Sequence, residues 1–432
     1  MNDSSLSRRD FARTGLATAA GALAASWVPA AARAGAPSSR YAEIRVGLIG
    51  CGGRGTGAAA NALRAAEGIK LVAIGDVFRK KAMSSLEALR ADGLAELVDC
   101  PEDSIYDGLD AYKKVIEHPQ VDVVLHAAPP GMRPLHLAAN VAAGKHAFIE
   151  KPCCVDPVGY RSVQESAKLA REKGLSIVTG TIFRRSNNYV DGIRAIHEGA
   201  LGDLLFAQAR YCSGGIWYRD REAGQSDVEY QMNNWYHFTW LSGDQIVEQA
   251  VHNIDCINWV MGGAPKRAYG SGGQRVRPAD SEIYDHTAID YEYPNGATCS
   301  FFCNQQPGKG MVWNRIVGTK GEAWIHPFGK TTLTTHGGET ILQSKYKGDA
   351  YVQEHTDLFA ALRAGKQLLE LDELNDSTLT AVIGRLAAYT GEEVSFEWAA
   401  KESKLDTYPQ QMELKGALPA PTVAVPGRTK LV

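Results

Sequence analysis

The sequence predicts an α/β protein in which a doubly wound parallel sheet is followed by a second domain with an antiparallel sheet. Short apolar segments alternate with helical segments between residues 43 and 150, and this alternation is typical of parallel strands joined by crossover helices. In the segment 265–345, by contrast, short runs of alternating polarity predominate. Two of these runs are separated by Pro-Asn-Gly at 294–296, a strong signal for a β-hairpin. A chain of 432 residues is long enough for two or three such domains.

Composition and charge restrict the function classes. The chain carries a formal net charge of −3, with 44% hydrophobic and 22% charged residues, which is typical of a globular protein rather than a disordered or fibrous one. This balance lacks the basic character of nucleic-acid-binding proteins, so we expect a small-molecule partner. The eight cysteines contain no CxxC spacing, so they predict no metal centre, and most of them are expected to be buried.

The first 34 residues have the features of an export signal. Ser7-Arg8-Arg9-Asp10-Phe11 is a twin-arginine signature, an apolar stretch follows over 14–28, and Ala32-Arg33-Ala34 resembles a cleavage site. The apolar stretch is shorter than the roughly 20 residues needed to cross a bilayer. We therefore expect a removable leader at 1–34, recognition by the twin-arginine translocase, and a periplasmic or otherwise extracytoplasmic location. An uncleaved anchor and a cytoplasmic Ala-rich tail are the alternatives.

The first predicted strand leads into a glycine-rich turn. Residues 43–49 are β-rich, the Ala-rich segment 56–66 is typical of a helix, and between them lies Gly50-Cys51-Gly52-Gly53-Arg54-Gly55. This order of strand, GxGxxG and helix is the fingerprint of a dinucleotide site, where the helix N-terminus receives the pyrophosphate. The predicted cofactor-binding residues of this turn are Gly50, Gly52, Gly53, Arg54 and Gly55.

The second strand, 71–75, ends at Asp76, which lies 21 residues after Gly55. A carboxylate at this place can accept hydrogen bonds from both ribose hydroxyls and repels a 2′-phosphate, so NAD is favoured over NADP. Arg79, Lys80 and Lys81 follow closely and could accommodate a phosphate, so NADP remains open. Asp76 could also simply cap the helix expected over 78–89.

The alternation continues with a strand at 121–126, a helix at 134–143 and a strand at 147–149 that leads into Glu150-Lys151-Pro152. Ligands of doubly wound sheets bind at the carboxyl ends of the strands, so Lys151 is expected at the ligand edge. The alternative is a solvated lysine at a strand end.

These motifs resemble the Gfo/Idh/MocA family of sugar and polyol oxidoreductases. Besides the glycine turn and Glu150-Lys151-Pro152, the resemblance rests on Ala127-Ala128-Pro129-Pro130, Gly144-Lys145-His146, Val317-Gly318-Thr319-Lys320-Gly321, Gln353-Glu354-His355, Ser377-Thr378 and Gly384-Arg385. It implies an N-terminal Rossmann domain for NAD(P) and a C-terminal α+β domain whose open, mostly antiparallel sheet carries the sugar site. It also implies that Pro129, Glu150 and Lys151 belong to the cofactor site and that Lys151 touches the substrate as well.

The segment 243–259 contains the densest group of chemically active residues. Read as one helix, it places Glu248 and His252 four residues apart on one face, with Asp255 one turn beyond His252. A carboxylate beside an imidazole can orient a general base. Members of the family that this sequence resembles often carry Asp-x-x-x-His at this place, whereas this chain has Glu248 instead of the aspartate. Glu248 therefore either supports His252 or contacts the substrate itself. A simple helix contact and a zinc site are the alternatives.

Aromatic residues are concentrated in the segment 211–240, where they alternate with charged and amide residues. Aromatic rings cover the C–H faces of sugars, and the polar residues bind the hydroxyls, although an ordinary aromatic core is the alternative. The predicted substrate-binding residues are Trp235 and Tyr236 from this segment, Arg184 and Arg185 after a strand expected at 176–182, and Asp255. Asp285, His286 and His355 are weaker candidates.

Together these features predict an exported NAD(P)-dependent oxidoreductase acting on a sugar, polyol or glycoside hydroxyl, with a tightly bound cofactor. His252 is expected to act as the base, oriented by Glu248, while Lys151 donates to the same hydroxyl oxygen. The alternatives are a redox-neutral NAD-dependent glycoside hydrolase and a non-catalytic sugar-binding protein that retains NAD.

The predicted domain organisation is a Rossmann domain at 35–165, a substrate domain at 166–403 and a Pro-rich arm at 404–432. We also expect a homodimer or homotetramer, because an open sheet usually buries its free face against another subunit.

Overall fold

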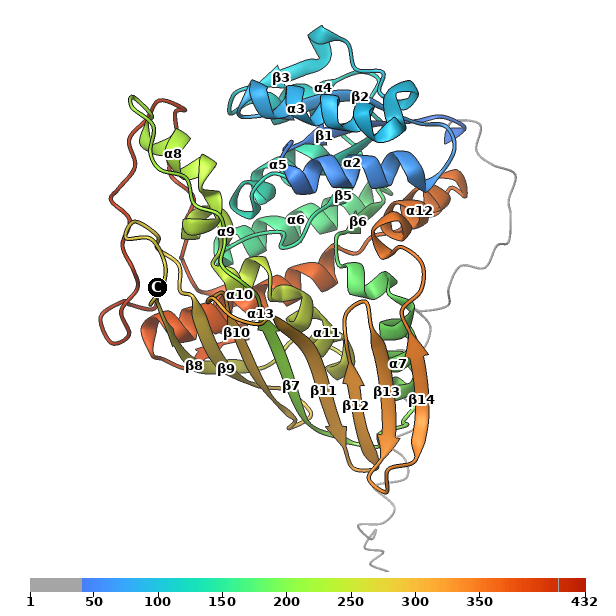
Figure 1. The fold of residues 1–432 in the computed structure, drawn as a ribbon, viewed down its shortest axis with the longest axis vertical. Coiled ribbons are helices and arrows are strands. Elements are labelled where there is room, and N and C mark those ends of the chain that lie inside the picture. Colours follow the sequence, from blue (N-terminus) through green and yellow to red (C-terminus); the bar gives the residue numbers. More distant parts are fainter. Residues whose placement is uncertain (1–40, 411) are drawn as a thin grey trace, which may run out of the picture.

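The computed structural model describes residues 41–410 and 412–432, so the leader predicted at 1–34 lies outside the described residues. The described chain contains a six-stranded and a nine-stranded sheet. The six-stranded sheet and its helices form the upper part of Figure 1, and the nine-stranded sheet forms the lower part. No helix within the described ranges combines the length and the apolar character needed to span a bilayer.

All strand pairs of the six-stranded sheet are parallel, in the order β3-β2-β1-β4-β5-β6. This confirms the predicted Rossmann-type, doubly wound sheet. Its strands are β1 (Ile44–Ile49), β2 (Ile69–Asp76), β3 (Ile105–Asp107), β4 (Val123–His126), β5 (His146–Ile149) and β6 (Ile177–Thr179). The α-helices between and after them are α2 (Gly53–Ala65), α3 (Arg79–Leu89), α4 (Ala111–Glu117), α5 (Arg133–Ala142) and α6 (Pro157–Glu172). Because helices cover both faces, nearly every residue of β1 and β4 is buried.

The nine-stranded sheet is mixed but mostly antiparallel, and it has the order β14-β13-β12-β11-β7-β10-β9-β8-β15. Only β7 and β10 pair in parallel among its neighbours. The Pro-Asn-Gly turn joins β9 to β10, and Tyr291 pairs with Cys299 across this antiparallel hairpin, as predicted. The strands are β7 (Leu204–Cys212), β8 (Arg267–Gly273), β9 (His286–Glu292), β10 (Thr298–Asn304), β11 (Met311–Gly318), β12 (Gly321–Ile325), β13 (Lys330–Thr335), β14 (Thr340–Lys345) and β15 (Val394–Ser395).

The remaining helices connect the sheets and cover one face of the larger one. They are α7 (Asn187–His197), α8 (Asp227–Asn233), α9 (Thr239–Ser242), α10 (Gln245–Glu248), α11 (Val251–Met261), α12 (Ala350–Arg363), α13 (Leu371–Thr390) and α14 (Phe396–Lys401). The short 3-10 and π turns are η2 (Arg90–Leu94), η3 (Ala95–Leu97), η4 (Glu102–Ser104), η5 (Pro130–Met132), η6 (Ile182–Arg185) and η7 (Trp235–His237).

Helix α13 joins the two domains. It packs against β8 and β9 of the large sheet and also against α6 of the nucleotide domain, so one hydrophobic core contains residues of both domains. Helix α12 extends this connection, because Leu358, Phe359 and Leu362 pack into the core of the six-stranded sheet. The two lobes are therefore held together by buried apolar surface, which fixes the walls of any site between them.

Candidate functional site

A cavity of about 590 Å³ lies at the carboxyl ends of the parallel strands, and residues of both domains line it. A volume of this size is within the usual range for small-molecule and cofactor sites. Thirteen residues that the sequence singled out line this cavity: Gly50, Gly52, Gly53, Arg54, Gly55, Asp76, Pro129, Glu150, Lys151, Trp235, Tyr236, Glu248 and His252.

The glycine turn has the geometry that a dinucleotide requires. Gly50 has a φ of 91°, which favours glycine. A Cβ on Gly55 would lie 1.8 Å from the carbonyl oxygen of Gly50, whereas a Cβ on Gly52 or Gly53 would meet nothing within 4 Å. Gly55 therefore permits close packing of helix and strand, and Gly52 and Gly53 leave open space beside the start of α2. The turn fits a pyrophosphate at the helix N-terminus.

Asp76 stands at the end of β2 and fixes the turn from the neighbouring strand. Its Oδ2 accepts a hydrogen bond from the backbone N–H of Cys51 at 2.8 Å, and its Oδ1 accepts one from Phe78 at 2.9 Å. Of the three cations considered for a phosphate, only Lys81 lines the cavity. Arg79 instead pairs with Glu102 and donates to the carbonyl of Ile105.

Two arginines support the wall around Glu150. Arg54 forms an ion pair with the carboxylate of Glu150 and lies over the ring of Tyr351, 4.8 Å from its centroid. Arg133 is buried and donates to the backbone carbonyls of Ala128 and Glu150 at 2.9 Å. Burial lowers the pKa of Arg133 to about 10, which leaves its guanidinium charged at neutral pH. These contacts hold the strand ends on either side of Lys151.

Lys151 and Glu248 form an ion pair across the boundary between the domains. The Nζ of Lys151 donates to Oε1 of Glu248 at 2.9 Å and to the Glu248 carbonyl at 2.5 Å. We expected Glu248 to orient His252 on one continuous helix. Within the described chain no hydrogen bond joins these two residues, and the carboxylate holds the lysine instead.

The prediction of one continuous helix over 243–259 is wrong, because this segment forms two helices. Helix α10 ends at Glu248 and α11 begins at Val251, so the simple four-residue spacing does not apply. The buried carboxylate of Asp244, whose φ is 78°, accepts hydrogen bonds from the N–H of Tyr284 and the hydroxyl of Tyr389. These long-range contacts fix the start of α10 independently of α11.

His252 lines the cavity from the first turn of α11, and its ring packs near that of Phe183, with centroids 5.2 Å apart. Burial lowers the pKa of His252 well below its ordinary value, and the positive charges of Lys151 and Arg54 act in the same direction. The imidazole is therefore neutral at physiological pH and has a lone pair available for a proton. A neutral acceptor and an ammonium donor thus line the same cavity.

Aromatic side chains form another part of the cavity wall. Trp217, Trp235 and Tyr236 all line the cavity, and their ring centroids lie 5.4–5.7 Å from one another. The hydroxyl of buried Tyr236 accepts a hydrogen bond from Nε2 of Gln305 at 2.9 Å. This cluster offers flat apolar faces next to the polar groups of Lys151 and His252, an arrangement suited to a ring that carries hydroxyls.

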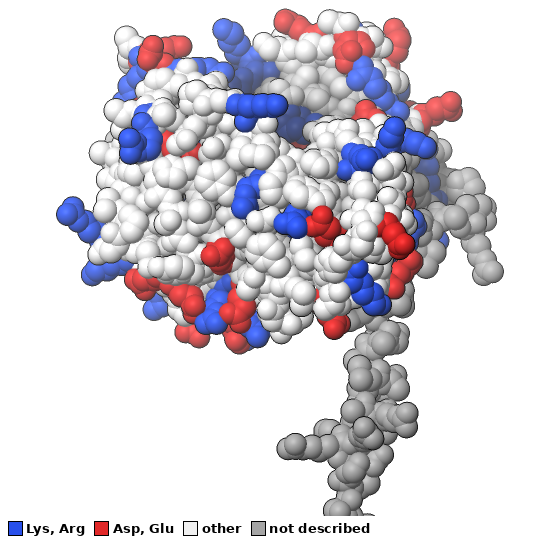
Figure 2. All heavy atoms as spheres, turned by 60° about the horizontal axis from the view of Figure 1, so that its bottom comes forward, with Lys and Arg blue, Asp and Glu red and all other residues white. Residues whose placement is uncertain are grey.

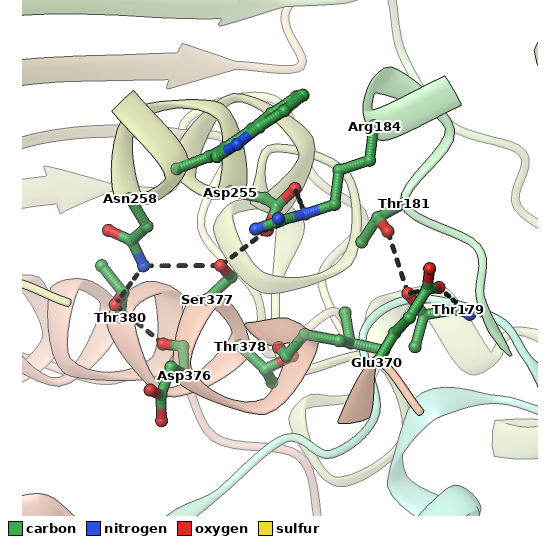
Figure 3. Close-up of polar contacts among 12 residues, drawn as sticks. Thr179, Thr181, Arg184, Asp255, Asn258, Glu370, Asp376, Ser377, Thr378 and Thr380 are labelled. Carbon is green, nitrogen blue, oxygen red and sulfur yellow. Dashed lines mark hydrogen bonds and ion pairs between the residues drawn. The ribbon is translucent and has the colours of Figure 1, made fainter. Parts of the chain in front are cut away.

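Arg184 and Asp255, predicted to bind substrate, instead form a buried ion pair away from this lining. The guanidinium of Arg184 donates to both carboxylate oxygens of Asp255, and Ser377 of α13 donates to the same carboxylate at 2.8 Å. Figure 3 shows this network continuing through Ser377 to Asn258 and Thr380. Because Asp255 lies on the buried side of α11, its contacts fasten that helix to η6 and α13.

Arg185 likewise lies outside the cavity lining. It pairs with Asp357 of α12 at 3.1 Å and with Glu370 just before α13, so it connects η6 to both helices. Of the weaker candidates, Asp285 pairs with His286 at 2.7 Å, and His355 is buried against Phe148. Arg184, Arg185 and Asp255 are wrong as substrate-binding predictions for a common physical reason: each is paired within the fold and does not line the cavity.

Several residues that line the cavity were not predicted from the sequence. Tyr351 comes from α12, Arg133 from the start of α5, and Gln249 from the break between α10 and α11. None stands in a local motif, and only their positions in the folded chain bring them together. Arg219, one of the charged residues among the aromatic residues of 211–240, also lines the cavity, as does Lys81.

The described residues do not support a metal centre. No group of three or more His, Cys, Asp or Glu side chains in the described ranges is arranged to hold a metal ion, and Glu248 of the alternative zinc set bonds to Lys151. All eight cysteines are buried free thiols, as expected for most of them.

Two family models match most of the described chain. Residues 44–181 match the Gfo/Idh/MocA model described as "Oxidoreductase family, NAD-binding Rossmann fold", and residues 193–324 match the "GFO/IDH/MocA C-terminal domain". The two matched segments correspond to the two lobes that line the cavity.

Individual relatives are distant. The chain is 22% identical to "scyllo-inositol 2-dehydrogenase (NAD(+))" of Bacillus subtilis over 79% of this chain and 92% of that protein. It is 25% identical to a "Glycosyl hydrolase family 109 protein" of Shewanella amazonensis over 52% of this chain and 50% of that protein. Three of the curated relatives are matched over only 50–67% of their own length.

The fold is shared with solved structures. Scyllo-inositol dehydrogenase of Lactobacillus casei, crystallised with NAD(H) and scyllo-inositol, aligns with a TM-score of 0.64 at 17% identity, covering 82% of this chain and 99% of that one. This likeness extends over both sheets and agrees with the arrangement of the two lobes.

Proposed function

This chain belongs to the Gfo/Idh/MocA family of NAD-binding oxidoreductases, and on that basis we propose that it oxidises a hydroxyl group of a sugar, polyol or glycoside. The observation that carries the proposal is the presence of Lys151 and His252, from different domains, in one cavity with the glycine turn. Relatives named as an inositol dehydrogenase and as glycoside hydrolases support a substrate of the carbohydrate class.

The N-terminal wall would hold the cofactor. The open space beside Gly52 and Gly53 suits the pyrophosphate, and Asp76 suits the hydroxyls of the adenosine ribose. A bound nicotinamide would supply the hydride acceptor. Arg54 and Glu150 neutralise each other beside this wall, so neither presents an unpaired charge to the cavity.

The two domains would share the proton chemistry. The neutral imidazole of His252 can accept the proton of the substrate hydroxyl, and the ammonium of Lys151 can donate to the same oxygen as negative charge develops on it. Glu248 holds Lys151 in place, because it accepts hydrogen bonds from the ammonium through both its carboxylate and its backbone carbonyl. The aromatic wall of Trp217, Trp235 and Tyr236 would hold the ring.

A substitution at His252 tests this assignment. We expect His252→Asn to lower kcat about 10²- to 10⁴-fold, the usual contribution of general base catalysis, while the affinity for NAD stays the same. Absorbance of reduced cofactor during incubation with candidate sugars and glycosides measures turnover, and fluorescence titration measures binding. Unchanged turnover in the variant would eliminate His252 as the base.

Redox-neutral glycoside hydrolysis is a second candidate, favoured by the relatives named as family 109 glycosyl hydrolases. Transient oxidation of the ring, elimination of the aglycone and reduction of the ring would use the same residues. Simultaneous measurement of aglycone release and cofactor absorbance separates the two reactions. Release without net reduction supports the hydrolase, and net reduction without release supports the dehydrogenase.

We also propose that the protein works outside the cytoplasm with a tightly bound cofactor, since free dinucleotide is scarce there. The twin-arginine signature at Arg8-Arg9 supports this proposal. Cell fractionation of the wild type and of a variant with Arg8→Lys and Arg9→Lys tests the export route. The variant should remain in the cytoplasm, whereas its unchanged export would contradict the proposal.

A homo-oligomer is proposed from the nine-stranded sheet. Helices cover one side of this sheet, and the other side carries partly exposed aromatic residues such as Phe302, Trp313 and Trp324. Figure 2, in which the lower part of the molecule comes forward, shows a broad face with few charges. Light scattering should give the mass of a dimer or tetramer, and a monomer at micromolar concentration would refute this proposal.

A further inference from the structure

One segment of the C-terminal domain extends over the cofactor wall of the cavity. Residues 213–226, here called the flap, connect β7 to α8, and their members Ile216, Trp217 and Arg219 line the cavity together with Gly52 and Asp76 of the glycine turn and β2. The flap therefore supplies a second wall to the part of the site that begins at the nucleotide domain.

Arg219 lies at the adenosine end of this cavity. Asp76, Phe78 and Lys81, which follow the end of β2, line the same end, and the ribose of a dinucleotide binds there in sheets of this type. Burial lowers the pKa of the Lys81 ammonium, Asp76 opposes this shift, and the charge of Arg219 adds to it. Arg219 and Lys81 are thus close enough to repel each other, and a ligand with phosphate groups would be attracted to both.

The flap is held in place by hydrogen bonds to its own domain. Asn234, which is fully buried, accepts from the N–H of Arg219 and donates to its carbonyl, both at 2.9 Å. Nη1 of Arg219 also donates to the carbonyl of Asn233 at 2.7 Å, and the ring of His237 bonds to the carbonyl of Trp217 at 2.8 Å. The guanidinium has further N–H groups that can bind a ligand from this fixed position.

The C-terminal arm (residues 404–410 and 412–432) braces the helix that follows the flap. Ser226 donates to the carbonyl of Leu414 at 2.6 Å, Lys415 pairs with Glu229 at 2.6 Å, and the N–H of Leu418 donates to Asp227 at 3.0 Å. Figure 1 shows part of this red C-terminal segment running beside α8. The arm thus stabilises the flap although it does not line the cavity.

We propose that the flap binds the adenosine half of the dinucleotide and that Arg219 is the residue that holds it there. The inference rests on the proposed function only in requiring dinucleotide binding. It provides a physical basis for cofactor retention, because a ligand bound by both lobes must break contacts with both before it dissociates. It also makes the second domain part of the cofactor site.

The chain offers a matched control for Arg219. Arg221 lies two residues further along the flap, is likewise exposed, and pairs with Asp227 at 2.5 Å without lining the main cavity. Arg219→Ala and Arg221→Ala therefore remove the same charge from the same loop, but only the first removes a group from the cavity. Arg219→Gln serves as a second variant, because it retains part of the side chain and one donor group.

The test measures the dissociation constants of NADH and of ADP-ribose, which lacks the nicotinamide, for the full-length protein. We expect Arg219→Ala to weaken both ligands about tenfold, Arg219→Gln to have an intermediate effect, and Arg221→Ala to change affinity less than twofold. Equal effects of the two alanine variants, or a loss confined to NADH, would overturn the proposal. Thermal unfolding without ligand verifies that each variant is folded.

The outcome is separable from that of the proposed function. If the wild type oxidises a carbohydrate but Arg219→Ala binds NADH normally, the flap assignment fails and the enzymatic function stands. If Arg219→Ala loses affinity for NADH and ADP-ribose but no carbohydrate is oxidised or cleaved, the flap assignment stands and the enzymatic function fails.

Discussion

The two walls of the cavity are built by different means. The N-terminal wall consists of short segments at successive strand ends, such as the glycine turn, Asp76 and Glu150-Lys151. The C-terminal wall combines the flap, η7 and the broken helix pair around Glu248 and His252. The first wall depends on backbone geometry at a few glycines, and the second depends on side chains held by long-range contacts.

This difference shows where substitutions should be most damaging. Where a Cβ added to a glycine would collide with backbone atoms, no change of rotamer can relieve the collision. A side chain in the other wall can be shortened while its neighbours adjust. Substitutions at the glycines of the first wall should therefore have larger effects than substitutions in the second.

The largest effect is expected at Gly55. In Gly55→Ala the new Cβ would lie 1.8 Å from the carbonyl oxygen of Gly50, so α2 must shift away from β1 and the turn must open. We expect the affinity for NAD to fall about a thousandfold, or about 4 kcal/mol, measured by fluorescence titration. Gly57→Ala in the same helix is the control, because its Cβ would meet only the guanidinium of Arg54 at 3.5 Å, an ordinary contact, and Gly57 does not line the cavity. Equal affinity of the two variants would refute the steric argument.

The second prediction concerns the ion pair behind the C-terminal wall. Asp255→Ala leaves the guanidinium of Arg184, whose side chain is 11% exposed, without its carboxylate. Loss of one partner of a buried pair costs about 3 kcal/mol or more, so we expect that decrease in the free energy of unfolding, measured with urea. The KM for substrate should change little in the folded fraction, because Asp255 does not line the cavity.

Glu397→Ala provides the control for this experiment. Glu397 pairs with Lys401 at 2.7 Å on the surface, where both side chains are largely exposed. An exposed pair contributes little to stability, so this variant should unfold like the wild type. A large rise in KM for Asp255→Ala would restore Asp255 as a substrate-binding residue.

The third prediction separates the two roles considered for Glu248. If the carboxylate positions Lys151, Glu248→Gln should lower kcat about 30-fold, or about 2 kcal/mol, by weakening a charged hydrogen bond. The same substitution should have little further effect in a Lys151→Met background. Steady-state kinetics on the four proteins of this double-mutant cycle measures the coupling. Independent effects in the two backgrounds would instead favour a role of Glu248 outside this pair.

The same contrast explains how much the sequence could predict. The glycine turn and the position of Asp76 follow from local spacing, and the Pro-Asn-Gly hairpin follows from turn chemistry, so the fold class could be predicted. Helical spacing also placed Glu248 beside His252, but that spacing takes no account of Asp244, which fixes α10 through Tyr284 and Tyr389.

The errors at Arg184, Arg185 and Asp255 have a related origin. Their residue types suit a sugar site, but their partners Ser377, Asp357 and Glu370 are distant in sequence. Whether a polar residue faces a cavity or another side chain is decided by tertiary packing, which no local pattern contains. The same holds for Tyr351, which reaches the cavity from α12.

The smallest expected effect is on the pH dependence of stability, through a histidine of α12 that packs against the six-stranded sheet. His355 of α12 is buried against Phe148, with ring centroids 4.3 Å apart, and its two nitrogens lack a hydrogen-bond partner among the described residues. Burial lowers the pKa of His355 to about 3, and the charges of Arg54 and Arg185 act in the same direction. The folded protein thus keeps this imidazole neutral in mild acid.

The unfolded chain protonates the same imidazole below about pH 6.5, so the unfolded state binds more protons and stability falls as pH decreases. Between pH 6.5 and 5.5 His355 should contribute a loss of about 1 kcal/mol in the free energy of unfolding. Urea unfolding at both pH values, with the NAD concentration held constant, measures it. His355→Leu should reduce the pH dependence by this amount whatever its absolute stability. An unchanged pH dependence in that variant would show that His355 binds its proton equally well in the folded and unfolded states, which would contradict its burial between α12 and the sheet.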